Sequence, residues 1–201
     1  MYMVPPNSRI GQQYSKLIDR KPTTIFSEVY CGLECANGDI WLGADRGILC
    51  LEQTKREWRL YPLPENLIQA ARIYEGRDGR IWFADVYGNS AVYDKLNHTW
   101  SGYKVCDPSP RKRDSSGSSD YSINAIYQDT LGHVLFGTFN GLVVFTEREN
   151  KWERFTAENS ILPGVTLIGS DKPTSKVTAL MEDHSGRIWI ATNGGIVILD
   201  R

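Results

Sequence analysis

Short apolar runs alternate with polar, glycine-bearing turns along most of this 201-residue chain. The pattern is clearest at residues 176–200, where three apolar runs (177–181, 187–191 and 196–199) are separated by two turns (183–186 and 192–195). Runs of about five residues, rich in Val, Ile and Trp and bounded by Gly, Asn and Asp, are typical of β-strands joined by hairpins. The last stretch of the chain therefore predicts three antiparallel strands.

The same phrase occurs four times, and each copy contains two glycines separated by nine residues. The pairs are Gly38 and Gly47, Gly79 and Gly88, Gly132 and Gly141, and Gly186 and Gly195. A hairpin turn that needs a positive φ accepts Gly without steric cost, so a constant spacing predicts a repeated strand of constant length. The first glycines follow one another at steps of 41, 53 and 54 residues.

Bulky residues are predicted on an outer strand and small residues on an inner one. Three copies carry a Trp with an aromatic residue three positions later, namely Trp58 and Tyr61, Trp100 and Tyr103, and Trp152 and Phe155. The matching inner-strand position is small in all copies but one, being Cys31, Arg72, Ala125 and Ala179. Tapered four-stranded units of about 40 to 50 residues are the sequence signature of a β-propeller.

We therefore predict an all-β propeller of four four-stranded blades, forming one domain at residues 11–201 after a tail at 1–10. The blades are placed at residues 27–62, 69–105, 122–156 and 176–201. The last repeat ends without an outer strand, whereas Tyr14 and Leu17 repeat the outer-strand spacing. Residues 11–19 are therefore predicted to complete the last blade and close the ring, because an exposed strand edge is a liability. The alternative is part of a larger ring, so the chain is expected to be a monomer or a strand-exchanged dimer.

Composition and charge narrow the classes of partner. Hydrophobic residues make up 41% and charged residues 23% of the chain, and the formal net charge is -1. These values suggest neither nucleic acid nor an anionic membrane as a partner. No apolar run has the length of a membrane-spanning helix, and the first residues lack the features of a secretory signal. The chain as written is expected in the cytoplasm, or in the periplasm if it is a fragment of a longer sensor.

Candidate catalytic chemistry is sparse. The three histidines, His98, His133 and His184, fall in or beside predicted turns, and the recurring Asp78, Asp129 and Asp183 are explained by Asp bonding its own backbone there. No phosphate loop, zinc spacing or serine elbow is present. The four cysteines, Cys31, Cys35, Cys50 and Cys106, are interpreted as buried thiols. We expect no catalytic residue, no metal site and no cofactor.

Candidate binding residues lie on the turns between second and third strands, which share one face of a propeller. They are Arg46, Tyr87, Phe139, Asn140 and Asn193. Polar and aromatic residues in this arrangement suit a sugar-like ligand or a peptide, although hairpin turns favour Asn and Gly in any case. Arg72 is added because a charge on the inner strand must pair or reach water. It is expected either to join blades through a carboxylate or to meet an anionic ligand.

Residues 181–196, MEDHSGRIWIATNGGI, closely resemble the two-component regulator propeller repeat of bacterial sensor kinases. Residues 127–142 and 74–89 are similar, with Leu135 in place of Trp in the first and Gly88-Asn89 in place of Gly-Leu in the second. The resemblance implies an extracytoplasmic propeller that binds a small molecule, often a saccharide, or docks another protein domain. The Gly-Arg-Ile-Trp phrase is also similar to the streptogramin lyase propeller.

Three functions follow from these residues and resemblances. The chain is predicted to be a non-catalytic, ligand-binding sensor module. The alternative is a protein–protein interaction platform that uses the connections at residues 107–120 and 157–175. The third is a streptogramin lyase-like enzyme.

Overall fold

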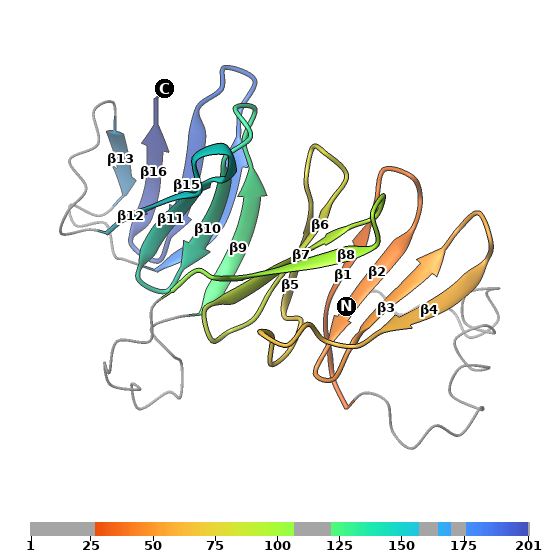
Figure 1. The fold of residues 1–201 in the computed structure, drawn as a ribbon. Helices are drawn as coiled ribbons and strands as arrows, with labels where there is room; N and C mark the ends of the chain where they lie inside the picture. Colours follow the sequence, from red (N-terminus) through yellow and green to blue (C-terminus); the bar gives the residue numbers. More distant parts are fainter. Residues whose placement is uncertain (1–26, 107–121, 157–164, 170–175, 201) are drawn as a thin grey trace.

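The structure is a computed structural model that describes residues 27–106, 122–156, 165–169 and 176–200 (Figure 1). The described residues form four antiparallel sheets of four strands each. The first sheet contains β1 (Val29–Glu34), β2 (Ile40–Ala44), β3 (Ile48–Glu52) and β4 (Glu57–Tyr61). The second contains β5 (Arg72–Glu75), β6 (Ile81–Ala84), β7 (Asn89–Asp94) and β8 (Thr99–Lys104).

The third and fourth sheets follow the same plan with two additions. The third contains β9 (Ile123–Gln128), β10 (Val134–Thr138), β11 (Gly141–Thr146) and β12 (Lys151–Phe155), with the short 3-10 helix η1 (Glu147–Glu149) before β12. The fourth contains β14 (Val177–Glu182), β15 (Ile188–Thr192) and β16 (Gly195–Leu199), joined by β13 (Val165–Gly169).

Glycine sets the turn between the first and second strands of every sheet. Gly38, Gly79, Gly132 and Gly186 have φ values of 84°, 77°, 87° and 80°. This left-handed region is open to Gly without a Cβ penalty, so the predicted reason for the repeated glycine is confirmed. Each turn carries the chain from one strand to its antiparallel neighbour at the same relative position.

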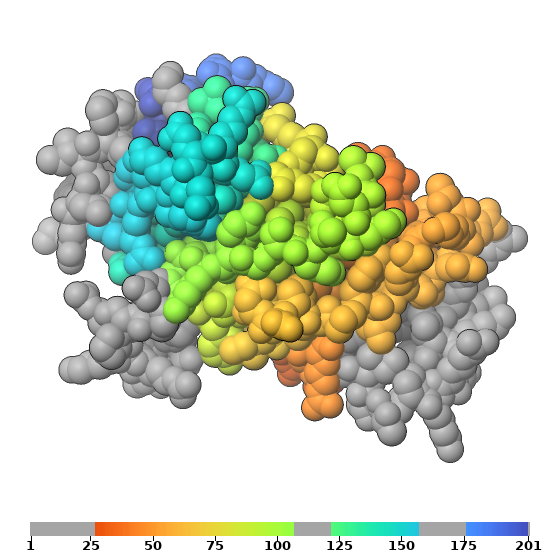
Figure 2. Space-filling model, viewed as in Figure 1, coloured from red at the N-terminus to blue at the C-terminus, as the bar shows by residue number. Residues whose placement is uncertain are grey.

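The sheets follow one another in sequence order across the molecule (Figure 2). They pack face to face, and one apolar core lies at each junction. Trp41 and Phe83 belong to the core between the first and second sheets, Trp82 and Phe136 to the next, and Leu135 with Ile190 to the last. The inner strands β1, β5, β9 and β14 lie next to one another along the arc. The all-β propeller architecture is therefore confirmed.

The predicted taper is visible in the packing. A Cβ atom at Gly43 would lie 2.4 Å from the carbonyl oxygen of Ala70, and one at Gly137 would lie 2.5 Å from Cγ1 of Val177. Neighbouring sheets therefore approach too closely for a larger residue near the inner strands. Farther out, the ring centroid of Trp152 lies 4.1 Å from that of Phe145 in a stacked arrangement, so wide aromatic groups fill the outer part of the junction.

The outer strand of the fourth sheet differs from the prediction. β13 pairs antiparallel with β16 and fills the edge that residues 11–19 were predicted to fill, which corrects that prediction. Residues 11–19 themselves lie outside the described residues. The connection after β12 contains the run Val-Thr-Leu-Ile at residues 165–168, which has strong β propensity and supplies the missing strand from within the chain.

The four sheets form an open arc. Contacts between sheets join β1 to β5, β5 and β6 to β9, and β9 and β10 to β14. The first and fourth sheets lie at opposite ends of this series (Figure 1). The described residues therefore do not form the closed four-bladed ring that the sequence predicts.

Candidate functional site

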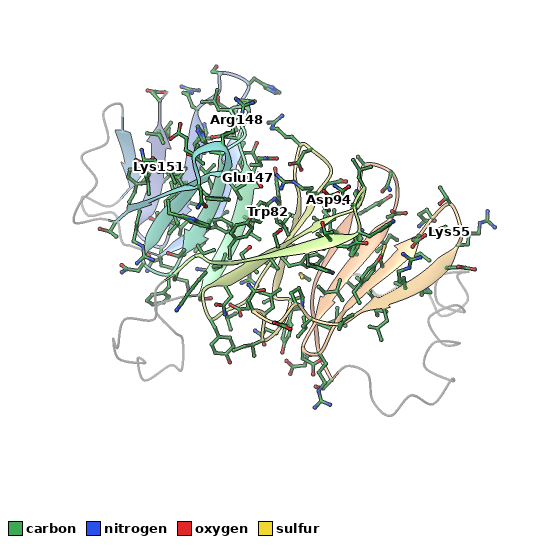
Figure 3. All side chains as sticks on the ribbon, in the orientation of Figure 1. Lys55, Trp82, Asp94, Glu147, Arg148 and Lys151 are labelled. Carbon is green, nitrogen blue, oxygen red and sulfur yellow. The ribbon has the colours of Figure 1, made fainter. Side chains whose placement is uncertain are left out.

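A cavity of about 380 Å³ lies between the first and second sheets. Its volume falls within the range of small-ligand pockets, about 300–1,000 Å³. It is bordered by the β1–β2 turn and by the β3–β4 and β7–β8 hairpins, and Figure 3 labels Lys55 at the tip of the β3–β4 hairpin. The lining residues are Asn37, Asp39, Trp41, Cys50, Glu52, Thr54, Lys55, Arg59, Tyr61, Tyr93, Lys95, Leu96 and His98.

Three aromatic side chains form one wall of this inter-sheet cavity. The ring centroids of Trp41 and Tyr61 lie 5.3 Å apart with an interplanar angle of 25°, and those of Tyr61 and Tyr93 lie 5.2 Å apart. Trp41 is buried, whereas Tyr61 is half-exposed. The second sheet supplies Tyr93, so the wall exists only because the two sheets pack together.

Hydroxyl and imidazole groups extend this wall. The Tyr93 hydroxyl lies 3.0 Å from Nδ1 of His98 and donates to the Tyr61 hydroxyl at 3.5 Å. Burial, with a further contribution from Tyr61, raises the pKa of Tyr93 above its ordinary value. Tyr93 is therefore a neutral phenol at physiological pH, and it can donate and accept hydrogen bonds but does not supply an anionic base.

The charged groups around the cavity already have partners, and Asp39 accepts from the Asn37 side chain and from the backbone N–H of Gln53. Glu52 accepts from Lys55 Nζ at 2.5 Å and lies 3.2 Å from Nε of Arg59. Lys95 lies 2.8 Å from Glu75, which is behind the lining. Because an ionic ligand would have to compete with these existing pairs, the arrangement suits a neutral polar ligand better than a strongly charged one.

A buried donor also belongs to the cavity wall. Trp41 is 1% exposed, and its indole Nε1 has no hydrogen-bond acceptor within the described part of the chain. A buried polar group without a partner is uncommon in native proteins and costs about 1–3 kcal/mol. Trp41 therefore contributes its ring to the cavity wall, while its N–H is enclosed by the protein.

The residues predicted from the turns lie elsewhere. Arg46, Tyr87, Phe139, Asn140 and Asn193 occupy the turns between second and third strands, one turn per sheet along one side of the arc (Figure 1). The Arg46 side chain is 70% exposed and lies 3.6 Å from Asp45. Tyr87 is 45% exposed, and Lys176 Nζ lies 5.5 Å from the ring centroid of Phe139.

Arg72 has partners that the sequence did not suggest. Its Nε donates to the carbonyl oxygen of Asn124 at 2.8 Å, and its Nη1 donates to that of Ala71 at 2.7 Å. The guanidinium thus joins the inner strand of the second sheet to that of the third. A sequence does not indicate which backbone carbonyl oxygens lie near a side chain. For this reason only a carboxylate or an anionic ligand could be proposed as the partner of Arg72.

The residues of the inter-sheet cavity were also missed from the sequence. The recurring aromatic residues of the outer strands were assigned to packing alone. The neighbouring polar residues lie on two different blades, and their proximity depends on how those blades pack. The sequence contains one signal that points to this region. The last repeat has Asp183 before its Trp, whereas the first repeat has Cys35 at that position, so Trp41 lacks an equivalent acidic residue.

His133 of the third sheet has a local partner. Nδ1 of His133 lies 3.0 Å from Oδ2 of the buried Asp129. Within the described ranges, no three His, Cys, Asp or Glu residues gather closely enough to hold a metal ion. The described part of the chain also contains no helix long and apolar enough to cross a membrane.

Stacked four-stranded sheets with small inner and aromatic outer residues place the protein in the β-propeller class. Residues 171–194 match the family model of the two component regulator propeller, so the repeat recognised in the last blade is confirmed. A search of curated proteins found no match.

Solved structures show the same fold over most of the chain. The extracellular domain of the one component system BT4673 from B. thetaiotaomicron has a TM-score of 0.61 and 17% identity, covering 86% of this chain and 21% of that one. A catalytically inactive virginiamycin B lyase from Staphylococcus aureus has a TM-score of 0.62 and 15% identity, covering 90% and 58%. The chain thus spans about a fifth and somewhat over half of these two structures.

A third structure belongs to the same sensor group. The extracellular domain of the hybrid two component system BT3049 from B. thetaiotaomicron has a TM-score of 0.52 and 17% identity, covering 88% of this chain and 27% of that one. At such identities the likeness concerns the fold alone.

Proposed function

We propose that this chain is a non-catalytic, ligand-binding module of a sensor-type propeller, and that the inter-sheet cavity binds a neutral saccharide. The observation that carries the proposal is the cavity of about 380 Å³, in which an aromatic wall meets neutral hydroxyls and charged groups that already have partners. The repeat at residues 171–194 supports a sensor role, and an extracytoplasmic location is part of the proposal.

The chemistry of a saccharide matches this wall. A sugar ring presents apolar C–H groups on its faces and hydroxyls at its edges, so it can stack on an aromatic ring while exchanging hydrogen bonds around it. Tyr61 offers a partly exposed ring, and the hydroxyls of Tyr61 and Tyr93 offer neutral donors and acceptors. Asn37 and Thr54 add uncharged polar groups at the rim.

The proposal that the module is non-catalytic rests on the hydrogen bonding and protonation of its tyrosine and histidine side chains. His98 faces the Tyr93 hydroxyl, and burial keeps Tyr93 neutral, so the phenol supplies no anionic base. His133 belongs to the third sheet and interacts with Asp129. The alternative function, a protein-interaction platform, uses residues 107–120 and 157–175, of which only β13 lies within the described residues.

The test is a thermal-shift screen of neutral mono- and oligosaccharides, acidic sugars and short peptides, followed by calorimetry of any hit. A saccharide at about 100 times its Kd should stabilise the fold by about 2.7 kcal/mol and raise Tm by about 5–10 °C. Tyr61→Phe, which keeps the ring, should weaken binding about 3- to 10-fold through loss of one hydroxyl.

A matched control separates the cavity from general surface effects. Arg59→Ala alters the rim of the cavity, and Arg148→Ala alters an exposed arginine on η1 of the third sheet. We expect the first to change saccharide affinity and the second to leave it unchanged. A screen with no saccharide hit, or a hit that Tyr61→Phe and Arg59→Ala both leave untouched, would reject the cavity as the binding site.

A further inference from the structure

One hydrogen bond recurs at every junction between neighbouring sheets. In each case a backbone N–H in the first turn of one sheet donates to the side chain that ends the inner strand of the next. The pairs are Ala36 N to Glu75 Oε2 at 2.7 Å, Arg77 N to Gln128 Oε1 at 2.7 Å, and Thr130 N to Glu182 Oε2 at 3.0 Å. Each donor lies two residues before the turn Gly of its own sheet. Each acceptor lies four residues before the turn Gly of the next sheet, to which it belongs.

The two ends of the arc carry the unmatched halves of this hydrogen bond. Glu34 is the equivalent acceptor on the first sheet, and it is exposed with no donor among the described residues. His184 is the equivalent donor on the fourth sheet, and its exposed backbone N–H meets no acceptor in the described ranges. Within the described residues, the arc thus has an unmatched acceptor at one end and an unmatched donor at the other.

The apolar contacts repeat in the same way. At each junction the residue three positions after the turn Gly packs against the following sheet, and Trp41, Trp82 and Leu135 are 1%, 0% and 0% exposed there. Trp189 holds this position in the fourth sheet but is only half-buried.

The outward face of the fourth sheet is apolar around Trp189. Met181 and Ile198 pair across the strands with Trp189, while their neighbours Leu180, Ile190 and Val197 pack inward on the third sheet. Met181 is 53% exposed, and Ile196, on the same face, is 36% exposed. Large exposed apolar residues gathered on one face mark an interaction surface.

The first sheet exposes the kind of surface that, at the internal junctions, is covered by the preceding sheet. At internal junctions the residue two positions after the turn Gly faces the preceding sheet, and Ile81, Val134 and Ile188 are each 0% exposed. Ile40 is the equivalent residue of the first sheet, and it is only half-buried. The chain therefore carries both complementary sides of one junction, at opposite ends of the arc (Figure 1).

We propose that a second copy of this chain binds these ends, with the fourth sheet of each copy packed on the first sheet of the other. His184 N–H would donate to Glu34 of the partner, and the face around Trp189 would cover the partner's Ile40. Both junctions form at once in a twofold arrangement, so no sheet face is left over. Two copies of four sheets give eight blades, the upper end of the usual range of about 4–8.

Light scattering behind a sizing column, over a concentration series, measures the proposed assembly. We expect twice the chain mass of 22.7 kDa. Met181→Glu and Ile196→Glu place charges in the junction and should raise the dimer dissociation constant at least about 100-fold. Leu131→Glu is the matched control, because Leu131 is 67% exposed in a turn of the third sheet. Circular dichroism checks that each variant is folded.

The hydrogen bond is tested by a conservative pair of variants. Glu34→Ala removes the acceptor and should weaken the dimer about 3- to 30-fold, whereas Glu34→Gln should retain it because Gln128 serves the same role inside the arc. Mixing a Glu34→Cys chain with a His184→Cys chain should give a mixed disulfide dimer under mild oxidation.

Three results would overturn the proposal. The first is a single-chain mass at every concentration. The second is a dimer that Met181→Glu, Ile196→Glu and Glu34→Ala all leave intact. The third is an open series of larger assemblies, which would mean that the ends meet without closing a ring of two.

Discussion

The indole Nε1 of Trp189 donates a hydrogen bond to Oδ2 of Asp183 at 2.8 Å, within the same repeat. The other described repeats have each lost one half of this pair. Cys35 and Gly76 stand where Asp183 stands, so the indole N–H groups of Trp41 and Trp82 are buried with no acceptor in the described ranges. In the third repeat the acid is kept as Asp129 but the Trp is Leu135, and Asp129 interacts with His133 instead.

The Asp183 pair predicts a pH-dependent contribution to stability. The Trp189 indole and, in addition, the Arg187 side chain and nearby backbone N–H groups hold the pKa of Asp183 well below its usual range. A lowered folded-state pKa stabilises the fold above the unfolded pKa of about 3.9, and this contribution is lost as the pH falls through the folded value. Asp183→Asn keeps an oxygen acceptor for Trp189 but removes the charge.

We therefore expect Asp183→Asn to be less stable than the parent chain at pH 7 and the difference to shrink below about pH 4. Denaturant unfolding at pH 7, 5 and 3, followed by Trp fluorescence, measures the difference. Ser185→Ala is a nearby control that leaves the carboxylate in place, and it should show no such pH trend. A difference that stays constant across this range would mean that the charge of Asp183 is unimportant.

A second prediction concerns the ion pair that joins the second and third sheets. Nη1 of Arg80 lies 2.7 Å from Oε1 of Glu147, and Nη2 lies 2.5 Å from Oε2. The Arg80 guanidinium also lies 6.0 Å from the ring centroid of Trp82, and Figure 3 labels Glu147 and Trp82 on these adjoining sheets. Arg80→Lys removes the two-point contact but keeps the charge.

The Glu147 side chain is 36% exposed, so solvent screens the pair and we expect Arg80→Lys to cost about 0.5–1 kcal/mol. The corresponding loss in Tm is about 1–4 °C. A double-mutant cycle with Glu147→Gln should give a coupling free energy of similar size. The exposed Arg148→Lys, one residue along the chain from Glu147, should change Tm by less than about 1 °C. Zero coupling would show that the pair adds nothing to the junction.

The repeated elements were predictable because they depend on local residues. The turn glycines, the alternating strands and the outer aromatics identified the propeller before any contact was known. The completion of the fourth sheet by β13 could not be predicted, because its run at residues 165–168 is short and has no counterpart in the other connections. Which segment pairs with β16 is decided by spatial proximity, which repeat spacing does not contain.

The candidate site was harder to predict for the same reason. The turns that carry Arg46, Tyr87 and Asn193 recur along the sequence, yet each belongs to a different sheet. The inter-sheet cavity instead combines Tyr61 of one sheet with Tyr93 of the next, two residues that do not occupy equivalent positions of the repeat. A cavity between two blades depends on how the blades pack, and a repeat pattern predicts the blades but not their packing.

A third prediction separates stability from binding at Arg72. Because its guanidinium donates to the carbonyl oxygens of Ala71 and Asn124, Arg72→Ala should leave two acceptors without this donor and cost about 1–3 kcal/mol. Arg72→Lys keeps one charged donor and should lose about half as much. Saccharide affinity should not change, since Arg72 does not line the inter-sheet cavity. Lost affinity with unchanged unfolding free energy would instead assign Arg72 to a ligand site.

The last prediction concerns the thiols. Burial raises the pKa of Cys31 and Cys106 to about 11 and that of Cys35 and Cys50 to about 12. At pH 8 a thiol with a pKa near 11 is ionised in about one molecule in a thousand, and only the thiolate reacts quickly. We expect iodoacetamide at pH 8 to label the folded chain slowly, beginning with the half-buried Cys31, and to label all four cysteines quickly in denaturant. Intact-mass spectrometry counts the labels, and a chelator added beforehand should change neither rate. Rapid labelling of the folded chain would mean that the sheet junctions open far more often than their packing indicates.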